Sequence, residues 1–151
     1  MTLVHENKAK MWFGLIIGIL YILFGIVQII VGLGFGSEIT KSILIPNDVL
    51  GGFILVLLGA VFLYGVKELN RGINEGVAYV YVGIFLALIF LVIYLLIMAA
   101  DAIEKYIIVS EDFLTWTPLD DMKPGIYLGI LALIGFLIWR KKFHLSKGIK
   151  K

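Results

Sequence analysis

Four apolar runs divide the chain, and short polar segments separate them. The runs span residues 11–33, 49–66, 76–100 and 125–139, and none of them contains Asp, Glu, Lys, Arg or His. A helix rises about 1.5 Å per residue, so roughly 20 apolar residues cross the hydrocarbon core of a bilayer. The fourth run is short, but Lys123 and Arg140 can reach the two interfaces beyond its ends. The pattern predicts an all-α integral membrane protein with four antiparallel transmembrane helices.

Residues that begin and end helices stand at the ends of these runs. Asp48 or Asn47 precedes the second run and is a suitable N-cap. Gly72 follows the same run, where a glycine commonly ends a helix. Asp120 or Asp121 is expected to cap the fourth helix in the same way.

The basic residues predict the orientation. If the N-terminus is inside, residues 1–10, 67–75 and 140–151 are inner segments, and they hold all of the 13 basic residues except Lys41, Lys105 and Lys123. Basic residues concentrate on the cytoplasmic side of membrane proteins. We therefore expect both termini in the cytoplasm and the protein in the cell membrane. The first run is longer than the apolar core of a signal peptide, so we expect it to be retained.

Small and weakly polar residues recur on one face of each run, at spacings of three, four or seven, as in a heptad. Small residues let helix backbones approach closely in lipid, where the hydrophobic effect does not drive helix association. We call this set the glycine seam, and expect it to hold the four helices together or, in part, to bind another subunit. The seam comprises Gly14, Gly18, Tyr21, Gly25, Gln28, Gly32, Gly52, Gly59, Gly83, Ala87, Tyr94, Gly125, Gly129 and Ala132.

Gln28 is the one amide side chain inside an apolar run. Its depth, roughly 25 Å from the inner end of its helix, matches that of Tyr94 in the third run. We therefore expect Gln28 to form a hydrogen bond to the third helix, with Tyr94 as a candidate partner. The runs offer no ionisable acid or base and no interrupting proline. Proton pumps and ion-coupled transporters normally need such groups, so these classes are disfavoured.

The outer segments, residues 34–48 and 101–124, are predicted to form a small extracytoplasmic cap. Residues 105–110 and 113–117 are rich in β-branched and aromatic residues, which favours a short β-hairpin, with residues 39–45 as a third strand. Two alternatives are that the third helix continues to about Lys105, or that residues 105–110 lie on the membrane surface. The acids of the second outer segment are expected to form a solvated patch rather than a metal site, because they lack calcium-loop spacing. They are Asp101, Glu104, Glu111, Asp112, Asp120 and Asp121.

The C-terminal segment is a basic tail. It is expected to contact anionic lipid headgroups while serving as an ordinary cytoplasmic end. Its principal candidates are Arg140, Lys141, Lys142 and Lys147. The two histidines, His5 and His144, have no second metal ligand at a suitable spacing.

Composition narrows the function without identifying it. Apolar residues make up 61% and charged residues 16% of the chain, against roughly 45–50% and 25% in average soluble proteins. There is no cysteine, and the net charge of +2 argues against nucleic acid as a partner. No segment carries a catalytic or family motif, so no cofactor is expected. We predict a small prokaryotic, non-enzymatic accessory or scaffold subunit in a homo- or hetero-oligomer. The alternative is a small oligomeric channel or carrier for an apolar or weakly polar solute.

Overall fold

The computed structural model describes residues 2–36, 40 and 42–140, and every regular element within these residues is helical. Three helices are long and apolar enough to cross a membrane, over Lys8–Phe35, Val49–Asn70 and Gly76–Ile108, and a shorter apolar helix covers Pro124–Trp139. The principal helices are α1 (Thr2–Ile30), α3 (Val49–Asn70), α4 (Gly76–Ile103) and α5 (Pro124–Trp139). One π-helical turn, Val31–Phe35, follows α1, and another, Glu104–Ile108, follows α4.

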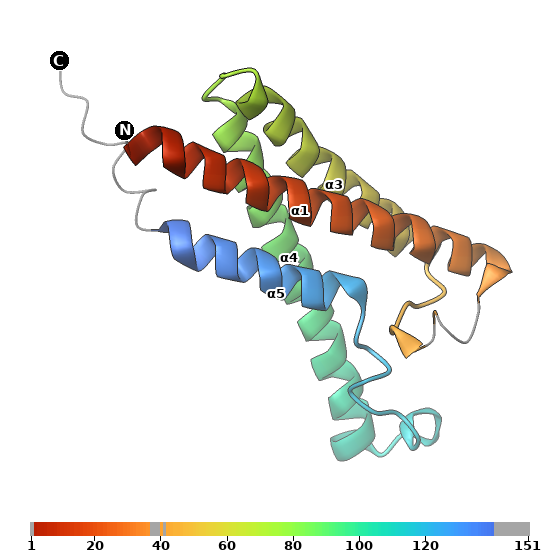
Figure 1. Cartoon of the computed structure of the whole chain (residues 1–151). Helices are drawn as coiled ribbons and strands as arrows, with labels where there is room; N and C mark the ends of the chain where they lie inside the picture. The colour runs from red at the N-terminus through yellow and green to blue at the C-terminus, as the bar shows by residue number, and fades with distance from the viewer. Residues whose placement is uncertain (1, 37–39, 41, 141–151) are drawn as a thin grey trace.

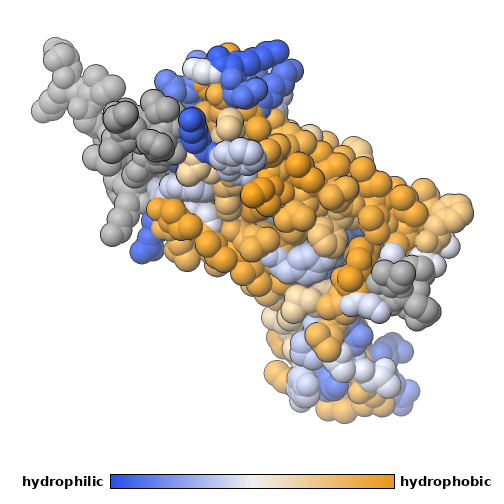
Figure 2. All heavy atoms as spheres, viewed as in Figure 1, coloured by the Kyte–Doolittle hydropathy of each residue, from blue (hydrophilic) through white to orange (hydrophobic). Residues whose placement is uncertain are grey.

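The helices pack around α1 and α3, which lie side by side (Figure 1). α5 runs along the other flank of α1, and α4 crosses behind these helices at a steep angle. The far end of α4 and the α4–α5 loop (residues 104–123) project away from the end of α1. Figure 2 shows an apolar belt over the helices between two hydrophilic ends, as expected of a chain that spans a bilayer.

Both ends of α3 follow from local sequence, and the two predictions for them are confirmed. Asp48 is the N-cap, and its Oδ1 accepts a hydrogen bond of 2.9 Å from the Gly51 N–H. At the other end Gly72 has φ +78°, the left-handed conformation that glycine adopts without strain. The Ile73 N–H then donates to the Glu68 carbonyl at 3.0 Å, which completes a Schellman motif.

The expected cap of the fourth helix is wrong. α5 begins at Pro124 with Lys123 in the N-cap position, and no side chain caps it. Asp120 and Asp121 instead accept hydrogen bonds within the α4–α5 loop, from Thr117 and Trp116 respectively. Proline at the first position lowers the need for a cap, since it has no N–H to satisfy.

The β-hairpin expected at residues 105–110 and 113–117 is also wrong. Residues 104–108 extend α4 as a π-helical turn that ends at Val109, whose φ is +58°. This is close to the alternative in which the third helix continues to about Lys105, although the helical turn reaches Ile108. β-propensity is a weak preference, and a helix that is already nucleated gains a hydrogen bond for each added residue. Of the proposed third strand, Ile39 and Lys41 lie outside the described residues, while Thr40 and Ser42 are helical.

Candidate functional site

The glycine seam brings the backbones of α1 and α3 into direct contact. A Cβ built on Gly25 would lie 2.7 Å from the carbonyl oxygen of Gly52. One built on Gly59 would lie 2.7 Å from the carbonyl oxygen of Gly18. No side chain fits at such a distance from backbone, so these positions require glycine. This face of α1 is therefore used within the chain.

Three glycines of the seam, on α4 and α5, face side chains of neighbouring helices. Gly83 on α4 lies against the Phe62 ring of α3, and Gly125 on α5 lies against the Tyr94 ring of α4. Gly129 faces Leu91 across the same pair of helices, with 2.8 Å from its built Cβ to the Leu91 Cβ. Ala87 and Ala132 are fully buried in the hydrophobic core. Other members of this core are Tyr21, Leu55, Phe62, Ile84 and Leu128.

Gln28 is buried, but its hydrogen bond runs to a different helix from the one predicted. Its Nε2 donates to the backbone carbonyl of Asp48 at 3.1 Å, so it joins α1 to the start of α3. The predicted bond to the third helix or Tyr94 is therefore wrong. Asp48 is an electrostatic neighbour of Tyr94. The N-terminal turn of α3 thus reaches the same region and provides a backbone acceptor for the amide.

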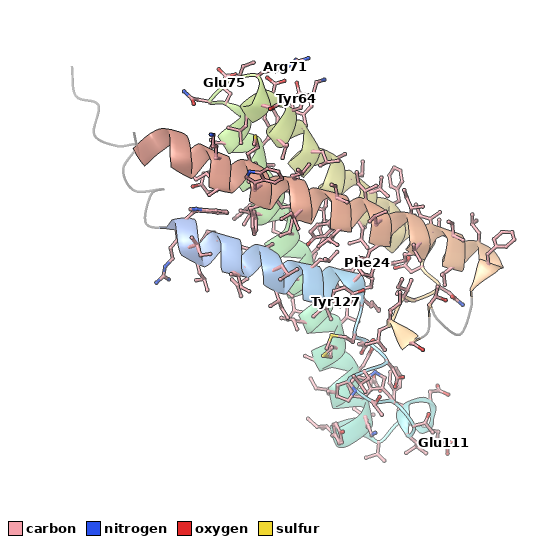
Figure 3. The ribbon with its side chains drawn as sticks, in the orientation of Figure 1. Phe24, Tyr64, Arg71, Glu75, Glu111 and Tyr127 are labelled. Carbon is pink, nitrogen blue, oxygen red and sulfur yellow. The ribbon has the colours of Figure 1, made fainter. Side chains whose placement is uncertain are left out.

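Gln28 lies in the same region as Tyr21 and Tyr94, because Tyr94 is an electrostatic neighbour of both Tyr21 and Asp48, and Asp48 is the hydrogen-bond partner of Gln28. We call these residues the polar cluster, together with Tyr127, whose ring contacts Phe24 of the same helix α1. Among the described residues, no partner accepts or donates a hydrogen bond at the Tyr21 hydroxyl, the Gln28 Oε1 or the Tyr127 hydroxyl. The Tyr127 ring meets the Phe24 ring edge-on, with 5.4 Å between the ring centroids, and Figure 3 labels both side chains, on α5 and α1. Hydroxyl and amide groups can bind a weakly polar molecule, but they are poor proton carriers at neutral pH. The cluster is therefore suited to hydrogen bonding rather than to proton transfer.

The hydroxyl of Tyr21 permits a direct test of this cluster. Tyr21→Phe keeps the ring stacked on Phe62, at 5.9 Å between centroids, and removes a buried hydroxyl without a described partner. An unsatisfied buried group costs about 1–3 kcal/mol, so the free energy of unfolding should rise by about 1 kcal/mol. Unfolding is measured by titration of detergent micelles with dodecyl sulfate.

Tyr21→Ala is the matched control, because it also removes the ring and should cost about 3 kcal/mol. If Tyr21→Phe lowers the free energy of unfolding instead, the hydroxyl has a partner, such as a bound water or solute.

The α4–α5 loop holds a second polar cluster around Trp116. The indole Nε1 donates to Asp121 Oδ2 at 3.0 Å, and both side chains are buried. The Lys105 Nζ donates to the Trp116 carbonyl, and the Lys123 Nζ lies 4.0 Å from Asp121 Oδ1. Asp101 from the end of α4 lies next to Asp121. These contacts fix the loop onto the end of α4.

The predicted acidic patch is therefore divided between two environments. Asp101 and Asp121 meet within the Trp116 cluster. Asp120 accepts hydrogen bonds from the N–H and hydroxyl of Thr117, at 2.6 and 3.0 Å. Glu104 lies at the end of α4, while Glu111 and Asp112 are exposed in a 3-10 turn, Glu111–Phe113. Within the described ranges, no group of three or more His, Asp or Glu side chains is arranged to hold a metal ion.

The basic tail is described only at its start. Arg140 is exposed at the end of α5, whereas Lys141, Lys142 and Lys147 lie outside the described residues, as does His144. Figure 3 places Arg71 and Glu75 at one end of the molecule and Glu111 at the other.

Two residues with central roles were not singled out from the sequence. Phe62 fills the space at Gly18 and Gly83, and Trp116 organises the α4–α5 loop. Nothing distinguishes Phe62 from the other apolar residues of its run. Trp116 could have been noticed because it is the one tryptophan in a loop rich in acidic residues.

The fold and the buried glycine contacts define the class of protein: an all-helical integral membrane protein. The chain belongs to the MJ0565 integral membrane domain family, whose family model matches residues 5–141. It is similar to the uncharacterized protein MJ0565 of Methanocaldococcus jannaschii, with 34% identity over 142 residues, 91% of this chain and 94% of that protein. No solved structure gave a significant match. The family establishes the membrane setting and carries no named activity.

Proposed function

We propose that the chain is a non-enzymatic accessory subunit of a larger assembly in the cell membrane. In this proposal α1, α3, α4 and α5 all cross the bilayer, and both termini are cytoplasmic. The positions of the basic residues support this orientation, since Lys8, Lys67, Arg71 and Arg140 all lie near the inner ends of their helices. The α4–α5 loop then forms the extracytoplasmic cap.

The observation that supports the subunit role is the uncovered outer half of α4. The last residue of α4 that is buried is Leu91, and residues 92–103 contribute no buried residue. Of the 18-residue apolar segment that represents α4, 22% is buried inside the protein, compared with 39% of the corresponding segments of α1 and α3. α4 therefore offers more free surface to a partner than the other long helices do.

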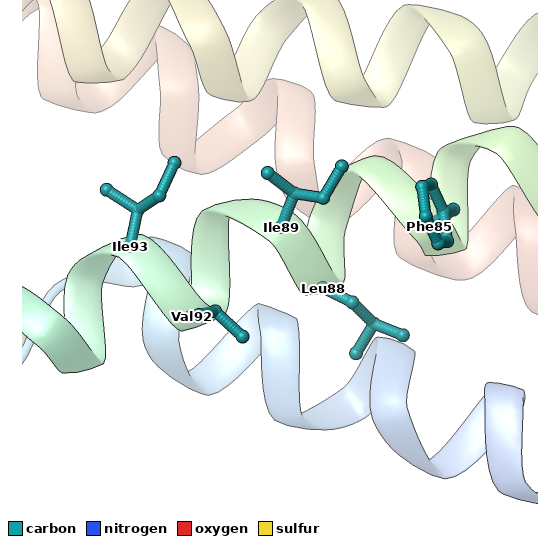
Figure 4. Close-up of a pocket in the computed structure, with 5 residues that line it drawn as sticks. All are labelled: Phe85, Leu88, Ile89, Val92 and Ile93. Atoms are coloured by element: carbon teal, nitrogen blue, oxygen red, sulfur yellow. The ribbon is translucent and has the colours of Figure 1, made fainter.

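The free surface of α4 is a continuous stripe, which we call the α4 face. Phe85, Ile89, Val92 and Leu96 follow spacings of four, three and four, which places them on one side of the helix. All four are exposed, and a shallow depression lies among the first three together with Leu88 and Ile93 (Figure 4). Exposed alanines, Ala99 and Ala100, continue the helix toward the loop, and small residues favour close helix contacts in lipid.

Site-directed photocrosslinking tests this proposal, because the chain has no cysteine and a single one can be introduced. A benzophenone attached at Val92→Cys or Leu96→Cys, in native membranes without overexpression, should yield a crosslink to another polypeptide of discrete mass. That polypeptide should also co-purify with the chain in mild detergent. Leu23→Cys and Ile134→Cys, which are similarly exposed on α1 and α5, should crosslink mainly to lipid. A clean monomer with the same lipid adducts at all four positions would contradict the subunit role.

A second candidate function is a carrier or channel for a weakly polar solute. The three buried polar atoms without described partners in the cluster of Tyr21, Gln28 and Tyr127 favour it. In proteoliposomes, permeability to glycerol or urea that falls in Gln28→Leu would support this role. Permeability equal to that of protein-free vesicles would exclude these two solutes.

A further inference from the structure

A groove of about 560 Å³ lies between the start of α1 and the end of α3. Such a volume is typical of small-molecule sites, at roughly 300–1,000 Å³. Its apolar lining includes Trp12, Leu15, Leu63 and Val66. Toward the end of α3 the lining changes to Lys67 and Asn70. The groove is therefore apolar along most of its length and has one cation and one amide at one end.

Lys67 places positive charge at the polar end of this groove, and a second lysine, Lys8, lies near it on α1. The Lys67 side chain is exposed, and its Nζ lies 5.9 Å from the centre of the Tyr64 ring. Lys8 is exposed one helical turn before Trp12, on the same side of α1. None of the lining residues is acidic.

The other basic residues nearby are occupied elsewhere. The Arg71 guanidinium lies 3.6 Å from the Glu68 carboxylate. Lys10 is buried, with its Nζ 5.4 Å from the centre of the Tyr81 ring. Lys67 is thus the cation that lines the groove, and Lys8 is an exposed cation one helical turn from the lining residue Trp12.

We infer that this groove binds an anionic membrane lipid. An acyl chain lies along Leu15, Leu63 and Val66, and the phosphate accepts hydrogen bonds from Lys67 and Asn70. Charge-assisted bonds of this kind are stronger than neutral ones. Trp12, 57% exposed beside the groove, is placed where tryptophans favour the membrane–water interface. An anionic lipid has an acyl chain that fits the apolar part of the groove and a phosphate that fits its polar end.

Quenching of Trp12 by brominated lipids tests the site. The fluorescence lost in Trp12→Phe isolates the Trp12 signal from that of the two other tryptophans. In vesicles that contain phosphatidylglycerol and phosphatidylcholine, brominated phosphatidylglycerol should quench Trp12 with about a tenfold higher relative binding constant. Lys67→Gln should reduce this preference about fivefold, as expected for the loss of one cation at an anionic surface. Lys67→Arg should retain it.

Arg140→Gln is the control, because it removes an exposed charge from the same end of the molecule but not from the groove. It should leave the preference unchanged. Equal quenching by the two lipids in the wild type would overturn the inference. So would an equal loss in Arg140→Gln and Lys67→Gln, which would indicate general surface attraction. Lys67 is exposed, so unchanged circular dichroism is expected to accompany each result.

Discussion

Gly25→Ala is expected to lower the free energy of unfolding by about 2 kcal/mol, because the added methyl group meets the backbone of α3. The new Cβ would lie 2.7 Å from the Gly52 carbonyl oxygen and 2.8 Å from the Val56 nitrogen. Both are backbone atoms of α3, so relief requires the helices to separate. Overpacking typically destabilises a protein by about 1–3 kcal/mol, while the higher helix propensity of alanine over glycine stabilises it by at most about 1 kcal/mol. Titration of micelles with dodecyl sulfate measures the change.

Gly14→Ala is the matched control within the same helix. Its Cβ would meet the side chains of Val66 and Val80 at 3.1 and 3.2 Å, which can adjust. We expect a change of less than about 1 kcal/mol there. The double variant Gly25→Ala/Gly52→Ala should cost less than the sum of the single changes, because the two share one contact. Equal effects at Gly14 and Gly25 would show that the α1–α3 backbone contact is not a determinant of stability.

The helices and their local ends could be predicted from the sequence, because both depend on nearby residues. Long apolar runs without charge leave few alternatives in a bilayer. The Asp48 cap and the Gly72 terminus depend on groups within five positions along the chain. The spacing of the glycines likewise marked the faces on which they lie. Which helix each face meets depends on the three-dimensional arrangement.

The prediction for Gln28 required knowledge of a distant neighbour, whereas the other two failed although the deciding groups lie close in the chain. Gln28 was paired with Tyr94 by depth, but depth cannot show that the Asp48 carbonyl is the acceptor. Residues 105–108 have β-forming side chains, yet they continue α4. Asp120 or Asp121 was expected to cap α5, but Thr117 and Trp116, three and five residues earlier in the loop, provide the donors.

Asp121→Ala is expected to destabilise the α4–α5 loop by about 2 kcal/mol. The substitution leaves the buried indole N–H of Trp116 without its acceptor, and a lost bond to a charged group costs about 1.5–3 kcal/mol. Removing the Asp121 carboxylate also relieves some repulsion with Asp101. This gain is smaller than the cost of the lost hydrogen bond, because Lys123, 4.0 Å from Asp121, already offsets part of the repulsion. The expected readout is a red shift of the Trp116 emission, isolated by comparison with Trp116→Phe.

Two variants separate the hydrogen bond from the charge. Asp121→Asn retains an oxygen acceptor for the indole N–H, so it should keep most of the stability and the blue-shifted emission. Asp120→Ala removes only exposed bonds to Thr117 and should change stability by less than about 1 kcal/mol. If Asp121→Asn is as damaging as Asp121→Ala, the carboxylate charge between Lys123 and Asp101 holds the loop. The Trp116 hydrogen bond would then be secondary.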